Sequence, residues 1–349
     1  MNKHNSSAVH FNSRPKALFA LGRQEFLWIY GPDERRDIAA LCDLPDQPFT
    51  RDMLAQNPDI LNPVEYLFSG WGAPRIDAAF LRHAPQLKVV FYGAGSLATV
   101  ATDAAWNSGI RFSSAAFANS IPVAEYSMAM IVMGLKQIWH HALRTRELKA
   151  WSTPGNFPGC YRSVVGLVSL GTIARLLIEK LRKYDLQIIA YDAFATPRQA
   201  DELGVELVSL PELFSRSDVI SLHTPLLAET RGMVNGALMA TMQPNATLIN
   251  TSRGAIINEP ELIAVARKRP DLQFILDVTD PEPPVPGSDI FTLSNIVLTP
   301  HIAGSQDREC ARMGRLMIEE FNRYRSGRPL EFEVTAKMAH NSIHRPVAV

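Results

Sequence analysis

The sequence predicts an α/β protein that is built on parallel β-sheets. Strand-like and helix-like segments alternate along most of the chain, which is the rhythm of βαβ units. The strand expected at 164–168 is almost wholly apolar, as in a parallel sheet that helices cover on both faces. The chain has 349 residues, which is enough for two domains of ordinary size. We therefore expect two parallel-sheet domains.

The first half of the chain begins with a polar segment, residues 1–15, which we expect to be loosely attached. The first 60 residues carry little recognisable pattern, and the alternation becomes clear after them. Strands are expected at 16–21, 66–72, 88–92 and 111–115, and helices at 76–84 and 99–108.

A long helical pattern follows at 122–148. Its apolar content is high enough for burial at a domain or subunit interface. Residues 151–162 are rich in Pro and Gly and predict a loop that separates this helix from a second set of strands.

The second half repeats the alternation more clearly, with strands that are short and apolar. Strands are expected at 164–168, 187–191, 205–208, 218–223, 247–250, 274–278 and 296–298. Helices are expected at 172–181, 211–216, 236–242, 259–269 and 305–324.

Composition excludes several classes of partner. Lys plus Arg and Asp plus Glu number 35 each, so no basic excess favours nucleic acid. The N-terminus holds no apolar run of secretory length, and no stretch approaches the ~18 apolar residues that span a bilayer. Cys42, Cys160 and Cys310 lie far apart, which favours reduced thiols in a cytosolic protein. The adjacent His140 and His141 make a poor chelate, so we expect no metal site.

A candidate nucleotide-binding turn follows the strand at 164–168. Against the pattern G-x-G-x-x-G/A, Ser169 takes the first glycine position, Gly171 the second and Ala174 the third. Gly171 would let the backbone approach a pyrophosphate at the start of the next helix. Ser169 departs from the pattern, because the first glycine makes the tight turn. A purely structural strand–turn–helix explains this segment alone equally well.

Asp192 supports the nucleotide interpretation. It lies 21 residues beyond Gly171, at the end of the next strand, where a carboxylate accepts hydrogen bonds from the adenosine ribose. A carboxylate there would also repel a 2′-phosphate, so we predict NAD over NADP. The alternative is a surface aspartate that caps a turn.

Several ordered motifs in the second half give the chain a family resemblance. They are His-Thr-Pro-Leu at 223–226, Asn-Thr-Ser-Arg-Gly at 250–254, Leu-Asp-Val at 276–278 and Leu-Thr-Pro-His-Ile-Ala-Gly-Ser at 298–305. From about residue 160 onward the chain resembles the D-isomer-specific 2-hydroxyacid dehydrogenases. Gly-Ala-Gly-Ser at 93–96 and Asn-Ser-Ile-Pro-Val-Ala-Glu at 119–125 match the family more loosely.

The resemblance implies two Rossmann-like parallel-sheet domains with a cleft between them. Residues 1–118 and 305–349 would form a discontinuous, flavodoxin-like substrate domain. Residues 119–304 would form the NAD-binding domain. The family also implies a homodimer that associates through the helix at 122–148.

The resemblance assigns catalytic roles to Arg253, Glu282 and His301. The planar fork of Arg253 suits a substrate carboxylate, although an arginine in a salt bridge at a strand end is the alternative. An imidazole titrates near ~6.5, which suits His301 to proton transfer. Glu282 would orient this imidazole and stabilise its protonated form. Asp280 is a nearby competing carboxylate that we interpret as a solvated loop acid.

The resemblance also implies residues that line the cofactor and the substrate. Asp277 would lie near the nicotinamide and its ribose, although it equally fits a cap at a strand end. Gly95 and Ser96 would assist Arg253 at the substrate carboxylate through their N–H groups. The other cofactor-binding residues would be Gly171, Thr172, Ile173, Asp192, Thr224, Pro225, Thr251 and Ser252.

We therefore predict an NAD-dependent oxidoreductase that transfers a hydride between NAD(H) and a small 2-hydroxy or 2-oxo acid. Two alternatives stay open: a regulatory, corepressor-like protein that senses NAD(H), and an NADP-preferring glyoxylate or hydroxypyruvate reductase. Trp71 and Tyr92 hint at an aromatic wall of the substrate pocket.

Overall fold

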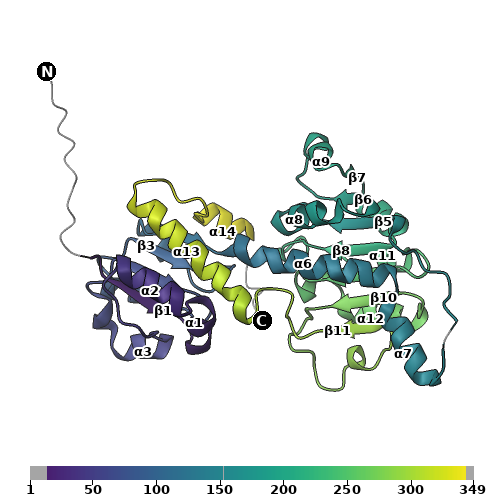
Figure 1. The fold of residues 1–349 in the computed structure, drawn as a ribbon, viewed down its shortest axis with the longest axis horizontal. Helices are drawn as coiled ribbons and strands as arrows, with labels where there is room; N and C mark the ends of the chain where they lie inside the picture. The colour runs from purple at the N-terminus through teal and green to yellow at the C-terminus, as the bar shows by residue number, and fades with distance from the viewer. Residues whose placement is uncertain (1–13, 152, 343–349) are drawn as a thin grey trace. The chain divides into compact units, whose positions relative to one another are not determined.

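The computed structural model of the protein describes residues 14–151 and 153–342 (Figure 1). These residues form two compact units. One holds residues 14–118 and Asp307–Ala339, and the other holds Asn119–Gln306 and residues 340–342. The chain thus passes between the units after residues 118 and 306. This division supports the predicted domains, which remain a proposal. The expected loose N-terminus lies almost entirely outside the described residues, as does the end of the C-terminal tail.

The sheet of the first unit has four parallel strands in sequence order. They are β1 (Ala17–Ala20), β2 (Tyr66–Ser69), β3 (Val89–Tyr92) and β4 (Arg111–Ser114). All residues of the first three strands are buried, because helices cover both faces of the sheet. The helices are α1 (Arg23–Ile29), α2 (Pro32–Leu41), α3 (Arg51–Gln56), α4 (Ala78–His83), α5 (Asp103–Asn107), α13 (Cys310–Arg325) and α14 (Ala336–Ser342).

Three helices of this unit, α1 to α3, fall where the sequence shows little pattern. They have 7, 10 and 6 residues, so each presents too few turns for a clear apolar period. Their stability comes from packing: Phe26 and Ile29 of α1 and Ile38 of α2 join Phe321 of α13 in one apolar core.

The linker segment forms two helices, α6 (Ala116–Leu135) and α7 (Ile138–Leu148), where the sequence predicts one helix at 122–148. The helical path breaks at Gln137, whose φ is +47°. The Gln137 side chain donates to the Asn245 carbonyl at 3.0 Å, so its position is fixed by a contact more than one hundred residues away. The apolar pattern alone continues through this break.

Helix α6 is long and apolar enough to cross a membrane by length and composition, with a mean hydropathy of 1.2. No such segment is expected from the sequence, because the expectation rests on an uninterrupted apolar run and α6 contains polar residues. It is the one helix among the described residues with this length and hydropathy. Buried core helices of globular proteins reach the same length and hydropathy. Ala124, Ile131 and Leu135 of α6 are buried in the core of the second unit.

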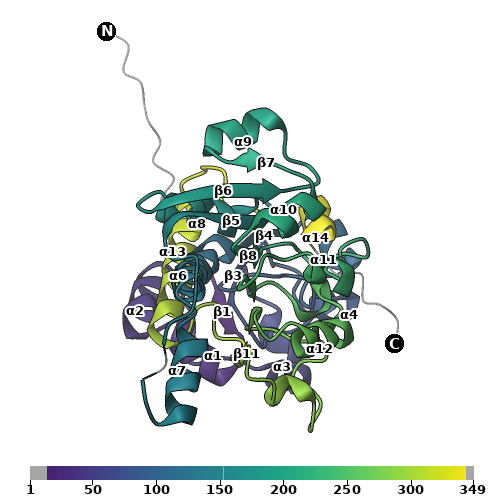
Figure 2. The same cartoon turned by 90° about the vertical axis from the view of Figure 1, so that its right-hand side faces the viewer.

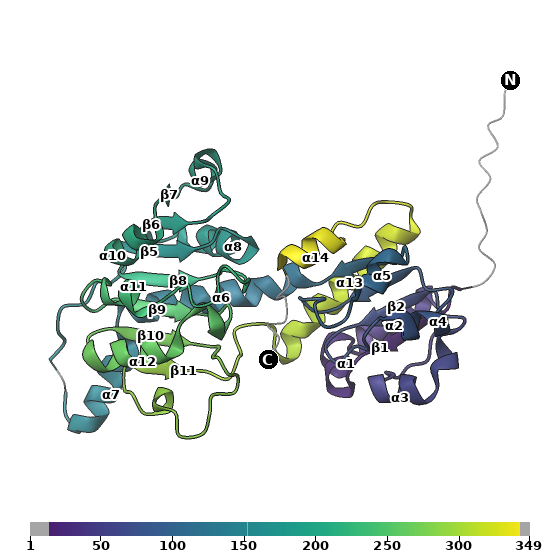
Figure 3. The same cartoon turned by 180° about the vertical axis from the view of Figure 1, so that it is seen from behind.

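The sheet of the second unit has seven parallel strands in the order β11-β10-β9-β8-β5-β6-β7, which Figure 3 shows from behind. The strands are β5 (Tyr161–Val168), β6 (Asp185–Tyr191), β7 (Glu206–Leu207), β8 (Val219–Leu222), β9 (Thr247–Asn250), β10 (Gln273–Leu276) and β11 (Ile296–Leu298). The order reverses between β5 and β8. In doubly wound sheets, ligands bind outside the carboxyl ends of the strands at such a switch point.

Helices cover both faces of this second sheet (Figure 2). Helices α6 and α8 (Thr172–Leu181) pack on one face. The opposite face is covered by α10 (Leu210–Arg216), α11 (Gly236–Ala240) and α12 (Glu259–Lys268), while α9 (Pro197–Leu203) lies beside β7. The predicted α/β fold with parallel sheets is confirmed.

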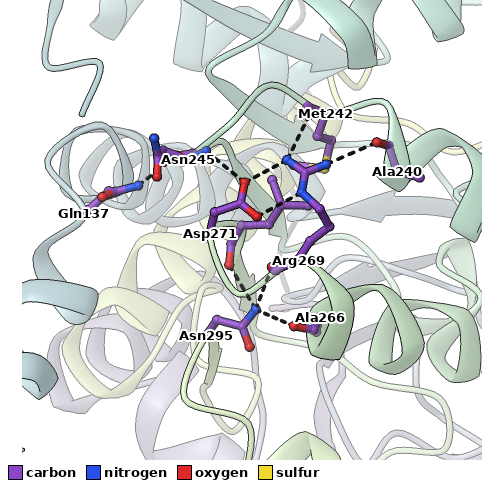
Figure 4. A network of polar contacts seen from close by, with 9 residues as sticks. Gln137, Ala240, Met242, Asn245, Ala266, Arg269, Asp271 and Asn295 are labelled. Atoms are coloured by element: carbon purple, nitrogen blue, oxygen red, sulfur yellow. Dashed lines mark hydrogen bonds and ion pairs between the residues drawn. The ribbon is translucent and has the colours of Figure 1, made fainter. Parts of the chain in front are cut away.

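A polar network fixes the amino-terminal edge of this sheet, away from the strands' carboxyl ends (Figure 4). Arg269 forms a two-point ion pair with Asp271, with N–O distances of 2.9 and 2.7 Å. The side-chain amide of Asn295 donates to the carbonyls of Ala266, Arg269 and Leu272. These contacts satisfy the carbonyls at the end of α12 and hold the turn into β10.

Candidate active site

The turn between β5 and α8 offers an open approach to backbone N–H groups. Gly171 precedes the helix, and a Cβ placed on it would meet nothing within 4 Å. No side chain caps the N-terminus of α8, so its first amides are available to an anion. These features fit a dinucleotide pyrophosphate, with Thr172 and Ile173 in the first turn of the helix.

Ser169 adopts a φ of +81°, a backbone conformation that favours glycine. Its hydroxyl donates to Asp192 Oδ2 at 3.2 Å, which partly compensates for the conformation. The serine at the first glycine position therefore keeps the tight turn, at a cost of about 1 kcal/mol in a left-handed conformation.

Replacing Ser169 with glycine is expected to stabilise the protein, because glycine adopts this φ freely. We expect the relief of the left-handed conformation to raise the free energy of unfolding by about 1 kcal/mol. The lost hydrogen bond from the Ser169 hydroxyl to Asp192 should offset part of this gain. Thermal unfolding measures the gain, and NADH fluorescence titration shows whether affinity rises with it. Ser169→Ala is the matched control, because it keeps the conformation and loses the hydroxyl, so its Tm should fall. A glycine variant less stable than the wild type would show that the hydroxyl contact dominates.

Asp192 accepts four hydrogen bonds, two from the turn between β5 and α8 and two from the turn that follows β6. Oδ2 accepts from Ser169 Oγ and from the Leu170 amide at 2.7 Å, and Oδ1 accepts from the Phe194 and Ala195 amides at 2.8 and 2.9 Å. Burial raises the pKa of Asp192, but these hydrogen bonds outweigh burial and leave the pKa lowered. The structure thus shows the turn-capping role. A ribose hydroxyl would have to bond to carboxylate oxygens that already accept these hydrogen bonds. The ribose contact of Asp192 therefore stays a prediction.

The loop after β9 presents Arg253. The Asn250 side chain accepts from the Ser252 amide and hydroxyl at 3.0 and 2.7 Å and donates to the Arg253 carbonyl at 2.9 Å. The backbone of Gly254, the next residue, lies very close to the backbone of Thr279. A Cβ at position 254 would lie 1.9 Å from the Thr279 carbonyl carbon. Asn250 and Gly254 therefore fix the loop's path.

The guanidinium of Arg253 donates to the Ser252 carbonyl at 2.6 Å. Although the residue is exposed, neighbouring protein desolvates the guanidinium and lowers its pKa, and the charge of Glu282 opposes this shift. An arginine remains protonated in either case. The side chain is thus a fixed positive charge near Glu282.

His301 and Glu282 form a hydrogen-bonded pair, with 2.5 Å between His301 Nδ1 and Glu282 Oε1. Both side chains are about half exposed, at 48% and 43%. The competing carboxylate, Asp280, pairs instead with Arg231 at 3.0 Å. Because Nδ1 faces Glu282, Nε2 is the ring nitrogen through which the predicted proton transfer would take place.

Asp277 follows β10 and is buried. Its carboxylate accepts from the Thr299 hydroxyl at 2.6 Å and from the amides of Ile302 and Ala303 at 2.8 and 2.9 Å. Its carbonyl accepts from the His301 amide at 3.0 Å. Asp277 thus holds the loop that carries His301, and its predicted cofactor role stays a prediction.

The remaining predicted cofactor residues also lie beyond carboxyl ends of central strands. Thr224 and Pro225 follow β8, and the Thr224 hydroxyl donates to the Val168 carbonyl at 3.3 Å. Thr251 and Ser252 follow β9, and Thr251 bonds to Ser127 of α6 at 3.3 Å. Since all strands are parallel, the second unit gathers these residues at one edge of its sheet.

Gly95 and Ser96 lie in the first unit, in the loop after β3. The Ser96 hydroxyl accepts from the Ala98 amide at 3.3 Å. Arg253 belongs to the second unit, so the joint role predicted for these residues stays a prediction.

The sequence analysis gave no role to His223, which belongs to the motif at 223–226 and is buried next to Thr224. Burial lowers its pKa to about 4, and its Nε2 bonds to Ser221 Oγ at 3.0 Å. It is therefore neutral near pH 7 and a poor source of protons. Tyr126 of α6, which bonds to Thr299 before His301, was also missed, whereas Asn119, which accepts from the Ser305 amide, lies within a segment that the resemblance already uses. No local pattern marks Tyr126, whereas Asn250 lies within a motif that the resemblance uses.

A doubly wound parallel sheet with a glycine turn at its switch point defines a dinucleotide-binding protein. Residues 128–303 match the family model described as D-isomer specific 2-hydroxyacid dehydrogenase, NAD binding domain. The chain belongs to this family, which confirms the resemblance and NAD(H) as the cofactor.

Curated relatives include D-3-phosphoglycerate dehydrogenase of Mycobacterium bovis, which is 31% identical over 87% of this chain and 54% of that protein. The chain therefore spans about half the length of such relatives. Glyoxylate reductase of Korarchaeum cryptofilum is 28% identical over 72% of this chain and 77% of its own length.

Two solved structures show the same fold. D-mandelate dehydrogenase of Rhodotorula graminis superposes with a TM-score of 0.75 at 22% identity, covering 92% of this chain and 97% of that one. A phosphoglycerate oxidoreductase from Rhizobium etli gives a TM-score of 0.76 at 21% identity, covering 93% and 98%.

Proposed function

We propose that the protein is an NAD-dependent oxidoreductase that interconverts a small 2-hydroxy acid and its 2-oxo acid. The observation that carries this proposal is the hydrogen-bonded pair of His301 and Glu282 in the same unit as a fixed positive charge, Arg253. A proton donor and a carboxylate-binding group are the two protein functions that such a reaction needs.

In the direction of reduction, the hydride that the carbonyl carbon of the substrate receives would come from NADH held at the turn around Gly171. His301 gives the proton from Nε2 to the carbonyl oxygen, so that C=O becomes CH–OH. Glu282 accepts a hydrogen bond from Nδ1 and stabilises the imidazolium before transfer. Arg253 binds the substrate carboxylate, with Gly95 and Ser96 as proposed helpers. In oxidation, neutral His301 takes the proton back.

The proposed cofactor contacts use the open turn at Gly171 and the adjacent helix N-terminus. Asp192 keeps a negative charge at the end of β6, because its hydrogen bonds favour the ionised form. A 2′-phosphate would meet that charge, so we propose that NADH is preferred over NADPH. Thr224, Pro225, Thr251, Ser252 and Asp277 complete the proposed cofactor set.

The test is turnover of NADH against glyoxylate, hydroxypyruvate, pyruvate, 2-oxoisocaproate and phenylpyruvate, with NADPH alongside. We expect oxidation of NADH with at least one of them, and the best substrate indicates the size of the pocket. NADH binding without turnover on a wide panel would favour a sensing role. Faster turnover with NADPH would contradict the proposed role of Asp192.

We also propose that the protein is a homodimer that associates through α6, α7 and the following loop. On α7, Ile138, Leu143 and Leu148 are more than one third exposed, and Trp151 just beyond the helix is 96% exposed. Apolar side chains gathered in this way mark an interaction surface.

Light scattering at micromolar concentration should give twice the chain mass of 38.7 kDa. Leu143→Glu should shift the mass toward that of the monomer, because it places a charge within the apolar surface. Leu27→Glu is the control, since Leu27 is exposed on α1 of the other unit and should leave the mass unchanged. A monomeric wild type would contradict the proposal.

The cytosol is the compartment that we propose. Cys42, Cys160 and Cys310 form no disulfide, and Cys42 and Cys310 are buried. Reduced thiols are typical of cytosolic proteins. The proposed partners are the small acid, NAD(H) and a second copy of this chain, with no nucleic acid or membrane among them.

A further inference from the structure

Helix α6 contacts both ends of the segment that carries His301. The Tyr126 hydroxyl bonds to Thr299 Oγ1 at 2.9 Å, and Asn119 Oδ1 accepts from the Ser305 amide at 2.9 Å. Residues 119 and 126 are two helical turns apart, so they lie on one face of α6. One helix face therefore holds the segment from residue 299 to residue 305.

The direction of the hydrogen bonds from Tyr126 to Asp277 follows from their chemistry. An ionised carboxylate only accepts hydrogen bonds, so Thr299 gives its single proton to Asp277. Tyr126 must then donate to Thr299 Oγ1. Burial raises the pKa of Tyr126, the bond to Thr299 opposes this, and the net pKa is raised, so the phenol keeps its proton. The order is Tyr126 to Thr299 to Asp277.

Asp277 in turn holds the backbone around His301 by hydrogen bonds. Its carbonyl binds the His301 amide, and its carboxylate binds the next two amides. His301 has a φ of +53°, a conformation that a residue other than glycine keeps only when its surroundings hold it. The direction in which the imidazole leaves the backbone therefore depends on the position of Asp277.

We propose that Tyr126 is a positioning residue for proton transfer, which acts through Thr299 and Asp277 to keep the His301 ring against Glu282. This inference rests on the proposed function, in which His301 transfers the proton. Two carboxylates then position His301, since Glu282 fixes the ring and Asp277 fixes the backbone. Tyr126 connects Asp277, through Thr299, to helix α6.

The test compares Tyr126→Phe with the wild type. The change removes only the hydroxyl, and the loss of one hydrogen bond in the chain should lower kcat by about three- to tenfold. The NADH Kd from fluorescence titration should stay within about twofold, because Tyr126 acts on the His301 loop. Tyr184→Phe, the same change at an exposed turn of the same unit, should leave kcat unchanged.

A double-mutant comparison separates the proposed chain from general loosening. Thr299→Val removes the middle hydroxyl, so adding Tyr126→Phe to it should lower kcat no further. Independent, multiplying losses would overturn the inference. So would a Tyr126→Phe enzyme with wild-type kcat.

A second readout does not depend on turnover. The proton between His301 Nδ1 and Glu282 should give a downfield NMR signal, which is assigned by its absence in His301→Gln. It should broaden or move in Tyr126→Phe and stay in place in Tyr184→Phe. If the signal responds while the wild type turns over no 2-oxo acid, the positioning role holds and the proposed function fails. If turnover is present and the signal does not respond, the inference fails.

Discussion

Replacing His301 with glutamine should lower kcat for 2-oxo acid reduction by about 10²–10⁴-fold, which is the usual contribution of a positioned acid. Glutamine keeps a polar side chain of similar length but carries no transferable proton near neutral pH. The NADH Kd should change little, because His301 is proposed to act on the substrate carbonyl. Steady-state kinetics and NADH fluorescence titration measure the two quantities.

Glu282→Gln is the companion variant. It removes the carboxylate that pairs with His301 Nδ1, so the ring loses the partner that orients it. We expect kcat for reduction to fall by at least about tenfold while the NADH Kd stays unchanged. A histidine variant that kept more than about a tenth of wild-type kcat would place the proton donor elsewhere.

The family resemblance, carried by motifs that follow apolar strands, singles out Arg253, Glu282 and His301 together, and the structure pairs His301 with Glu282 in the same unit as Arg253. In a parallel sheet, the carboxyl ends of these strands share one edge, so residues far apart in sequence meet there. Asp277 also lies at this edge. Its contacts, however, could not be predicted, because they depend on how the loop after β11 folds back onto the end of β10.

Contacts from the linker helix were beyond sequence reasoning. Tyr126 and Thr299 are separated by 173 residues, and a tyrosine within an apolar helix shows no local sign of such a partner. The break at Gln137 has the same origin, since the αL conformation is fixed by Asn245. Helical period reports which face is apolar and does not report which polar atom lies opposite.

Ser169 and Asp192 show a third kind of limit. The motif marks Ser169 as a departure, but only the structure shows that its hydroxyl bonds to Asp192. The same carboxylate that the motif assigns to a ribose is engaged in holding the turn. A motif gives residue types and spacing, whereas competition for lone pairs depends on local backbone geometry.

Replacing Arg253 with lysine should raise the KM for the 2-oxo acid and lower kcat/KM by about 10- to 100-fold. The variant keeps a positive charge. It loses the planar fork that binds a carboxylate at two points, and it changes the donor that now bonds to the Ser252 carbonyl. The effect should therefore appear with every acid on the panel, because all of them share the carboxylate.

Arg231→Lys is the matched control for this experiment. Arg231 lies in the same unit and pairs with Asp280, and both side chains are 46% exposed, so the change should leave kcat/KM within about twofold. The NADH Kd should be unchanged in both variants. If Arg253→Lys kept the wild-type KM, the guanidinium would be a structural anchor for its own loop through Ser252, and other groups would have to bind the substrate carboxylate. An equal rise in the NADH Kd would instead place Arg253 at the cofactor, so the two titrations together decide which molecule this arginine binds.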